Sequence, residues 1–211
     1  MQGSAPPRTQ SRAQLDGLRE EFLDRLGDSP YPDAVTMAFD LAWPRTQELF
    51  PDEITPAVRA FGDQYTKRIP ALFAKLSEPP LVLSPADWRL DNLFFTPADD
   101  VVAVDWQLID RSVAPRDLAY LVTQSLNVEA RDGHEQAFTA YLDDLAEEGV
   151  EPDADWAWDM YRYGTMLGFV YPVIVAGGLT IEDPRHVALA HALLVRSLRA
   201  IELLDAFNLP L

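Results

Sequence analysis

Residues 86–107 read ADWRLDNLFFTPADDVVAVDWQ, and this stretch carries the strongest structural signal in the 211-residue chain. Two short apolar runs, Leu93–Phe95 and Val101–Val104, lie on either side of the turn-forming residues TPADD. Apolar runs of this length, bounded by Pro and Asp, are typical of buried strands. The stretch therefore predicts a β-hairpin made of two buried strands.

Three oxygen-bearing side chains lie at the ends of this hairpin, namely Asp87, Asn92 and Asp105. Asp87 and Asn92 have the D-x-x-x-x-N spacing of the kinase catalytic loop, in which the aspartate accepts the attacking hydroxyl's proton and the asparagine holds a metal ion. Asp105 ends the next strand, where a kinase places its second Mg²⁺-binding carboxylate. Phosphoryl transfer needs such hard oxygen ligands, because Mg²⁺ must neutralise the phosphates beside the base. The alternative interpretation is structural, with both aspartates capping turns and the asparagine holding a loop.

Helical periodicity dominates the rest of the chain. Ser11 and Gln14 resemble a capping box before a first helix, and Thr55 followed by Pro56 predicts the start of another. Further helices are expected over 34–49, 117–129, 133–148, 153–177 and 183–207. The first of these would be interrupted or kinked at Pro44, and Asp183 would be the N-cap of the last. A further strand is expected over 81–83. The expected fold class is α+β, mainly α.

Composition excludes several classes of function. The net charge is −17, which argues against nucleic acid, because phosphate contacts need clustered Lys and Arg. The chain has no Cys, so disulfides and Cys-ligated metal sites are excluded. The first residues, MQGSAPPRTQ, lack the apolar region of a secretory signal and read as a loose tail. We therefore expect a cytoplasmic protein.

An uncharged segment over 163–181 is long enough to be considered as a membrane span. Four glycines and Pro172 interrupt it, and no Lys/Arg cluster flanks it to set an orientation. A buried core helix kinked at Pro172 is the preferred interpretation, with no membrane partner.

The segments LVLSPADWRLDNLFF, VVAVDWQ and APRDLAYLV together resemble the aminoglycoside phosphotransferase family of small-molecule kinases, in the branch near the ecdysteroid-kinase-like proteins. Members of that family usually read HGDxRxDNLxF, then DWQ, then DLAY. The resemblance extends from about Ala34 to the C-terminus. It implies the C-terminal lobe of a protein-kinase-like fold, in which a small β-hairpin carries the catalytic and metal-binding loops.

The resemblance also implies a chemistry. An ATP-dependent phosphotransferase would use Mg²⁺ and ATP to phosphorylate a hydroxyl of a small-molecule acceptor. Asp87 would be the catalytic base, and Asn92 and Asp105 would bind Mg²⁺ and, through it, the nucleotide. Asp117 in DLAY would support the catalytic loop from the start of a helix, where a carboxylate can accept backbone N–H bonds.

Two features depart from the family pattern. Pro85 and Ala86 replace the usual His-Gly, which predicts a distorted loop because alanine tolerates positive φ poorly. The chain also has only two lysines, Lys67 and Lys75, both on a predicted helix, and no paired glycines before Asp87. A kinase's N-terminal lobe needs a Gly-rich loop and a strand lysine.

The expected organisation is therefore a flexible tail over 1–11 and a kinase-like C-terminal lobe over 12–211, with the N-terminal lobe absent or supplied by another chain. Within the lobe, helices would span 12–76, the catalytic hairpin region 81–107, and further helices 117–207. Two alternatives remain open. One is an inactive pseudokinase or remnant that acts as a binding module, and the other is an unrelated Mg²⁺-dependent hydrolase using the same oxygen ligands.

Overall fold

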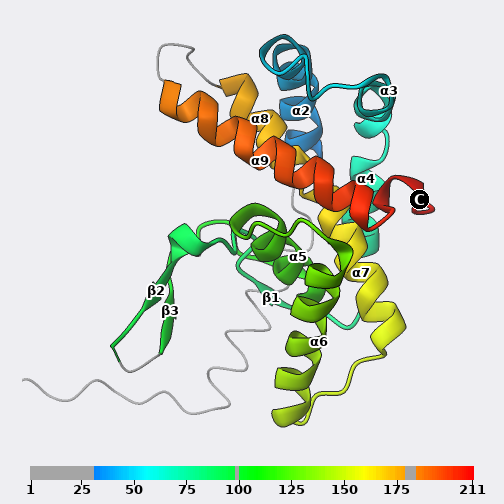
Figure 1. Ribbon diagram of the computed structural model, residues 1–211. Helices are drawn as coiled ribbons and strands as arrows, with labels where there is room; N and C mark the ends of the chain where they lie inside the picture. The colour runs from blue at the N-terminus through cyan, green and yellow to red at the C-terminus, as the bar shows by residue number, and fades with distance from the viewer. Residues whose placement is uncertain (1–30, 98–99, 179–183) are drawn as a thin grey trace, which may run out of the picture.

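The computed structural model describes residues 31–97, 100–178 and 184–211, and these form a mainly helical body with two small antiparallel sheets (Figure 1). The helices are α2 (Tyr31–Leu49), α3 (Pro56–Tyr65), α4 (Ile69–Leu76), α5 (Ala114–Ser125), α6 (Arg131–Glu147), α7 (Ala154–Leu167), α8 (Val170–Gly178) and α9 (Pro184–Leu203), with 3-10 turns η1 (Leu90–Asn92) and η2 (Ala206–Asn208). The strands are β1 (Val82–Ser84), β2 (Leu93–Phe95), β3 (Val101–Ala103) and β4 (Asp110–Ser112). The expected α+β, mainly α class is confirmed. The predicted tail, the first helix and the Asp183 N-cap lie outside the described residues.

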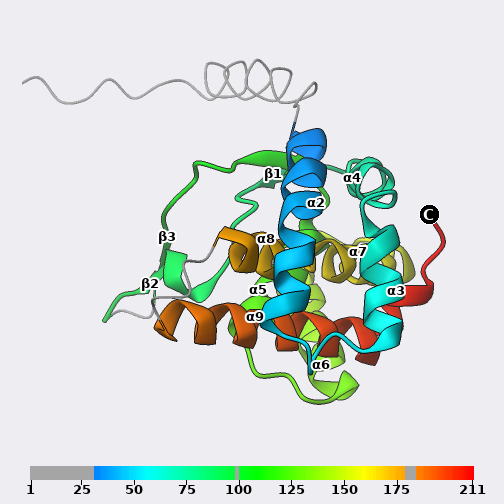
Figure 2. The same cartoon turned by 90° about the horizontal axis from the view of Figure 1, so that it is seen from above.

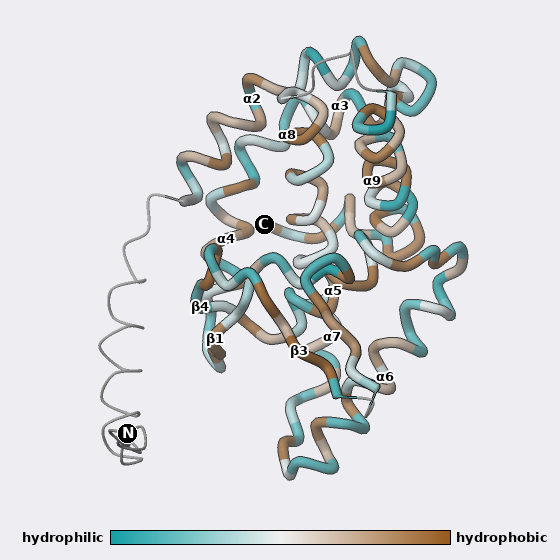
Figure 3. The backbone as a smooth tube through the Cα atoms, turned by 90° about the vertical axis from the view of Figure 1, so that its left-hand side faces the viewer, coloured by the Kyte–Doolittle hydropathy of each residue, from teal (hydrophilic) through white to brown (hydrophobic). Residues whose placement is uncertain are grey.

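The predicted hairpin is present, but its strands are not buried. Strands β2 and β3 pair antiparallel, with Leu93 opposite Ala103 and Phe95 opposite Val101. The hairpin extends away from the helices in Figure 1, and Figure 3 colours β3 as hydrophobic. Phe94 and Phe95 are 60% and 66% exposed. The expectation of buried strands is wrong because a two-stranded ribbon buries a face only where another layer covers it.

A second strand pair anchors the loop over residues 85–92, called the catalytic loop below for its resemblance to that of kinases. Strand β1 pairs antiparallel with β4, with Val82 opposite Ser112 and Ser84 opposite Asp110. Strand β4 was not expected, since its sequence DRS contains no apolar run. The pairing brings the end of β1 next to the start of α5.

The core lies between the helices. Helix α2 packs on α8 and α5 packs on α7, and Figure 2 shows α2 crossing over α8. Tyr65 of α3 is fully buried and donates a hydrogen bond to the carbonyl oxygen of Met166 in α7 at 2.7 Å. A Cβ added at Gly164 would lie 2.9 Å from the Cα of Arg116, so glycine is what allows α5 and α7 to approach so closely.

Prolines start helices here more often than they break them. The described part of the uncharged segment, residues 163–178, contains the end of α7 and all of α8, and the two helices meet at Gly168 and Phe169, so the expected single helix kinked at Pro172 is wrong. Pro172 lies in the first turn of α8, where a missing N–H costs no hydrogen bond. Pro44 lies inside a continuous α2, and the predicted N-cap Thr55 accepts a bond from the N–H of Val58. Within the described ranges, no helix combines the length and apolar character needed to cross a membrane.

Candidate active site

The loop between β1 and η1 holds Asp87 against Asn92. The Asn92 amide nitrogen Nδ2 donates to the Asp87 carboxylate oxygen Oδ2 at 3.0 Å and to the Asp87 backbone carbonyl at 2.9 Å. Asn92 is only 7% exposed, so this link is shielded from water. Because Nδ2 is engaged by Asp87, the amide oxygen Oδ1 is the atom of Asn92 left to meet a cation.

Asp105 is placed by the hairpin itself. The N–H of Val104 donates to the carbonyl oxygen of Asn92 at 2.9 Å, which sets Asp105 one residue beyond the backbone contact with Asn92. Its side chain is exposed, and Gln107 Nε2 lies 3.5 Å from its Oδ2. The structure therefore brings Asp87 and Asn92 into direct contact. Asp105 directly follows Val104, the residue whose backbone N–H bonds to Asn92.

Two residues of this site have a strained backbone conformation. Ala86 and Asp105 have φ values of 59° and 62°, in the left-handed region that L-residues seldom adopt. The expected distortion of the loop by Ala86 does not prevent the contact between Asp87 and Asn92. Alanine instead takes up the conformation that would suit glycine, at an energetic cost.

Asp117 lies in the first turn of α5, beneath the loop. Its carboxylate accepts a hydrogen bond from the Ser84 hydroxyl at 2.8 Å and one from the backbone N–H of Ala86. Burial raises the pKa of the Asp117 carboxyl above its ordinary value, although the neighbouring Arg116 and these hydrogen bonds act in the opposite direction. Arg116 is itself buried and paired with Asp110 at 3.0 Å.

Two side chains that contact Asp87 were given no role from the sequence. The Tyr120 hydroxyl donates to Asp87 Oδ1 at 3.1 Å, and Arg89 Nε lies 3.5 Å from the same oxygen. Burial raises the pKa of Tyr120 far above its ordinary value, so the phenol stays a neutral donor. Tyr120 lies three residues after Asp117, on the same face of α5. That spacing is a signal that could have identified it.

The donor set suits Mg²⁺ bound together with phosphate. Asn92 Oδ1 and the Asp105 carboxylate are hard oxygen donors. No group of three or more His, Cys, Asp or Glu side chains that could hold a metal gathers in the described part of the chain. Mg²⁺ sites that act on nucleotides use one or two protein oxygens and complete the shell with phosphate and water. The residues present fit that kind of site.

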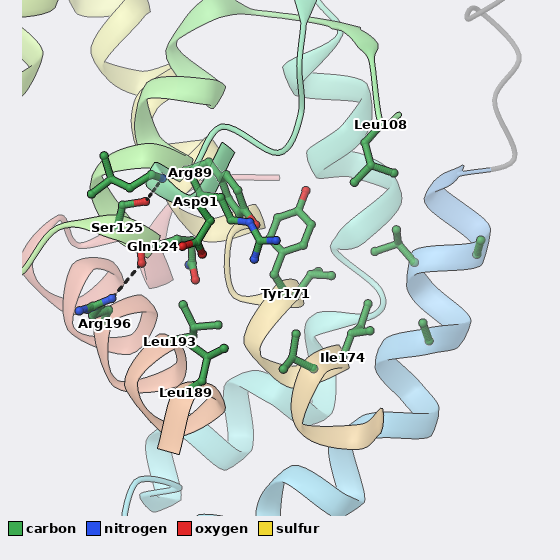
Figure 4. A pocket seen from close by; sticks show the side chains of 17 residues that line it. Arg89, Asp91, Leu108, Gln124, Ser125, Tyr171, Ile174, Leu189, Leu193 and Arg196 are labelled. Carbon is green, nitrogen blue, oxygen red and sulfur yellow. Dashed lines mark hydrogen bonds between the residues drawn. The ribbon is translucent and has the colours of Figure 1, made fainter. Parts of the chain in front are cut away.

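A cavity of about 600 Å³ opens beside the catalytic loop (Figure 4). Helices α2, α8 and α9 supply most of its apolar wall, which includes Val35, Ala38, Ile174, Val175, Leu189 and Leu193. The end of the cavity next to the loop is lined by Arg89, Asp91 and Tyr120 of α5. Tyr171 packs edge-on against Tyr120, with ring centroids 4.7 Å apart. Arg89 and Tyr120 therefore line the cavity and contact Asp87 at the same time.

Comparison with known proteins identifies a family. No curated protein matches the chain. The model of the ecdysteroid kinase-like family matches residues 18–149, which is more than half of the 211 residues. The matched range contains the catalytic loop, the hairpin and Asp117. It begins earlier than the expected start of the resemblance at Ala34, and it ends at residue 149 and not at the C-terminus. The chain therefore belongs to the ecdysteroid kinase-like family, a kinase-like family.

Proposed function

We propose that this protein is an ATP-dependent phosphotransferase that moves the terminal phosphoryl group of ATP to a hydroxyl of a small molecule, as aminoglycoside phosphotransferases do. One observation carries the proposal. The Asn92 side chain holds the Asp87 carboxylate at 3.0 Å, at the end of a hairpin whose other strand leads directly into Asp105. Family membership supports kinase-like chemistry.

Asp87 is the general base in this proposal. It accepts the proton of the acceptor hydroxyl while the acceptor oxygen forms a bond to phosphorus and the bond from phosphorus to the ADP oxygen breaks. Asn92 Oδ1 and the Asp105 carboxylate would hold Mg²⁺, which neutralises phosphate charge when bound. Asn92 would thus act twice, because its amide nitrogen orients the base and its oxygen would be a ligand of the metal.

Asp117 is a positioning residue in the same proposal. Its bonds to Ser84 and to the N–H of Ala86 tie the loop to the first turn of α5. Helix α5 is in turn fixed against α7 at Gly164. The base is therefore supported by rigid helices, which catalysis by positioning requires.

The cavity beside the loop is the proposed acceptor site. Its volume of about 600 Å³ lies within the range of small-molecule sites. Its wall on α2, α8 and α9 is apolar, and its polar end lies at Tyr120 and Arg89, both in contact with Asp87. An acceptor with an apolar body would bury that body against the helices and present its hydroxyl to the base.

The phosphates of ATP also need donors on the side away from Asp105. Kinases supply these from a Gly-rich loop and a strand lysine. The described residues provide no such element, because Lys67 lies in the turn between α3 and α4 and Lys75 lies on α4. We propose that a second lobe, on another chain or elsewhere in the protein, completes the site. Acting alone, this acidic chain should bind free ATP weakly unless Mg²⁺ bridges the two.

Isothermal titration calorimetry with Mg²⁺–ATP tests the proposal. We expect weak binding by the wild-type chain, abolished in Asp105→Ala and strengthened by a candidate N-terminal lobe added in trans. Asp100→Ala is the matched control, because it removes the same charge from an exposed position on the same hairpin. Binding that Asp105→Ala leaves unchanged would exclude the proposed nucleotide site. Tight binding by the chain alone would remove the need for a second lobe.

A further inference from the structure

Helix α2 has an apolar face that no other part of the described structure covers. Met37 and Leu41 are 65% and 80% exposed, and their spacing of four residues places them on the same face of the helix. The other side of α2 packs on α8 and contributes Phe39 and Trp43 to the core (Figure 2). Large apolar side chains at helical spacing are typical of a helix face that packs on another element.

Acidic residues border this apolar face. Asp33, Asp40 and Glu48 are exposed, and their spacings of about two helical turns keep them on one side of α2, together with Met37. An element that covers this face therefore needs an apolar stripe flanked by positive charges.

Residues 12–26, which precede α2 in the chain, have this pattern. The helix predicted after the Ser11 capping box would carry an apolar stripe formed by Leu15, Leu18, Phe22 and Leu26. Three arginines flank that stripe at helical spacing, namely Arg12, Arg19 and Arg25. Glu20 and Asp24 fall on the opposite side of the predicted helix. The stripe and its arginines thus complement the exposed face of α2 in both polarity and charge.

The connection to α2 is short. Only residues 27–30, GDSP, separate the predicted helix from the start of α2. Helices joined by a connection of about two to five residues lie antiparallel and next to each other. Counting outward from the connection along both helices places Arg19 opposite Asp40 and Arg12 opposite Glu48, each pair matching to within about one helical turn.

We infer that residues 12–26 dock as a helix on the exposed face of α2, antiparallel to it. Leu18 and Phe22 pack on Met37 and Leu41, and the arginines face the acidic residues of α2. A second copy of the chain could offer the same stripe, but the chain's own segment is tethered by four residues. Such a tether gives it an effective concentration on the order of millimolar, which favours the segment of the same molecule.

The docked segment would border the cavity beside the catalytic loop. Ala34 and Ala38 adjoin the exposed face of α2, and both line that cavity. Residues 12–26 would therefore lie along the α2 side of its mouth. The docking itself does not depend on the proposed function and can be tested without a nucleotide or an acceptor.

Paired cysteine substitutions measure the contact in the full chain, which has no cysteine of its own. Arg19→Cys with Asp40→Cys tests the middle of the two helices, and Arg12→Cys with Glu48→Cys tests their far ends. Glu20→Cys with Asp40→Cys is the matched control, because Glu20 is next to Arg19 in sequence but lies on the other side of the predicted helix.

Each protein is treated in dilute solution with a short bismaleimide crosslinker, whose reach tolerates a shift of one helical turn, and intact mass is measured. We expect both test pairs to lose their two free thiols as crosslinked monomers. The control pair should instead carry separate crosslinker molecules on its two thiols, because a helix is about 10 Å across.

Every other result overturns the inference. Crosslinked dimers in place of crosslinked monomers would show that a second copy covers the face. Equal crosslinking of the control and the test pairs would show that the segment presents no fixed side to α2. If only the Arg19 and Asp40 pair reacts, the segment does not lie along α2, and if neither test pair reacts, it does not dock there.

Discussion

The carboxylate of Asp117 accepts a hydrogen bond from the hydroxyl of Ser84 at 2.8 Å, across 33 positions of the chain. It also accepts the backbone N–H of Ala86, the residue directly before the proposed base. The start of helix α5 is thereby joined to the end of strand β1. The conformation of the catalytic loop depends on a side chain that lies outside the loop.

Replacing Asp117 should therefore loosen the loop. In Asp117→Ala the Ser84 hydroxyl, which is buried, and the Ala86 N–H lose their acceptor, and we expect the free energy of unfolding to fall by about 2–3 kcal/mol. Asp117→Asn keeps one acceptor oxygen without the buried charge and should lose less. Urea denaturation of the three proteins measures the difference. Equal losses in the two variants would show that the hydrogen bonds do not hold the loop.

Ala86 offers a stabilising substitution. Its φ of 59° costs an alanine about 1–2 kcal/mol. Glycine adopts this region freely, and its cost is the larger conformational entropy of the unfolded chain. We expect Ala86→Gly to raise the free energy of unfolding by about 0.5–1 kcal/mol. Ala119→Gly, at a buried helical position of α5, is the control and should lower it by about 1 kcal/mol. A loss of stability in Ala86→Gly would contradict the proposed strain.

The sequence was informative where local pattern decides the structure. The hairpin of Leu93–Phe95 with Val101–Ala103 follows from two apolar runs around a turn, and the N-cap at Thr55 follows from side-chain chemistry. The exposure of Phe94 could not be predicted in the same way, because it depends on which other layer covers the hairpin. Strand β4 was missed because its residues pair through the backbone with β1 and carry no apolar run.

At the site, too, local spacing was informative and contacts between distant parts of the chain were not predicted. The spacing of Asp87 and Asn92 follows the pattern of a kinase catalytic loop, and the structure places the two side chains within 3.0 Å of each other. Tyr120 reaches Asp87 from 33 positions away, and its spacing of three residues from Asp117 places it on the face of the helix that carries Asp117 without showing that it contacts Asp87. The proposed acceptor cavity is formed by α2, α5, α8 and α9 together, so its lining depends on tertiary packing that no single segment encodes.

Stability should also depend on the protonation of His134. This residue of α6 is 1% exposed, and its Nδ1 lies 2.8 Å from the Tyr161 hydroxyl. Burial lowers the pKa of His134 from 6.5 to about 4. As pH falls, the unfolded chain takes up a proton on this ring while the folded protein keeps it neutral. The contribution of His134 to stability is therefore fully present above pH 6.5, its pKa in the unfolded chain, and is lost as pH falls towards 4.

We expect this one residue to account for about 3 kcal/mol of acid destabilisation between pH 7 and pH 4. The carboxylates of the chain titrate in the same range, so the measurement is the difference in unfolding free energy between wild type and His134→Asn at each pH. Asparagine can still meet Tyr161 but takes up no proton. The difference should favour wild type most at pH 7 and shrink as pH falls. A difference that is constant with pH would show that His134 does not titrate on unfolding.

The contact between Tyr120 and Asp87 can be measured without knowing the acceptor. The hydroxyl donates to a charged oxygen in a partly buried site at 3.1 Å, and a bond of that kind contributes about 1.5–3 kcal/mol. A double-mutant cycle of Tyr120→Phe with Asp87→Asn should yield a coupling of about 1–2 kcal/mol in unfolding free energy. Tyr171→Phe, which removes a second hydroxyl from the same cavity wall, should show no coupling with Asp87→Asn. A coupling below about 0.5 kcal/mol for Tyr120 would mean that the phenol only packs beside the base, and Asn92 would then be its main support.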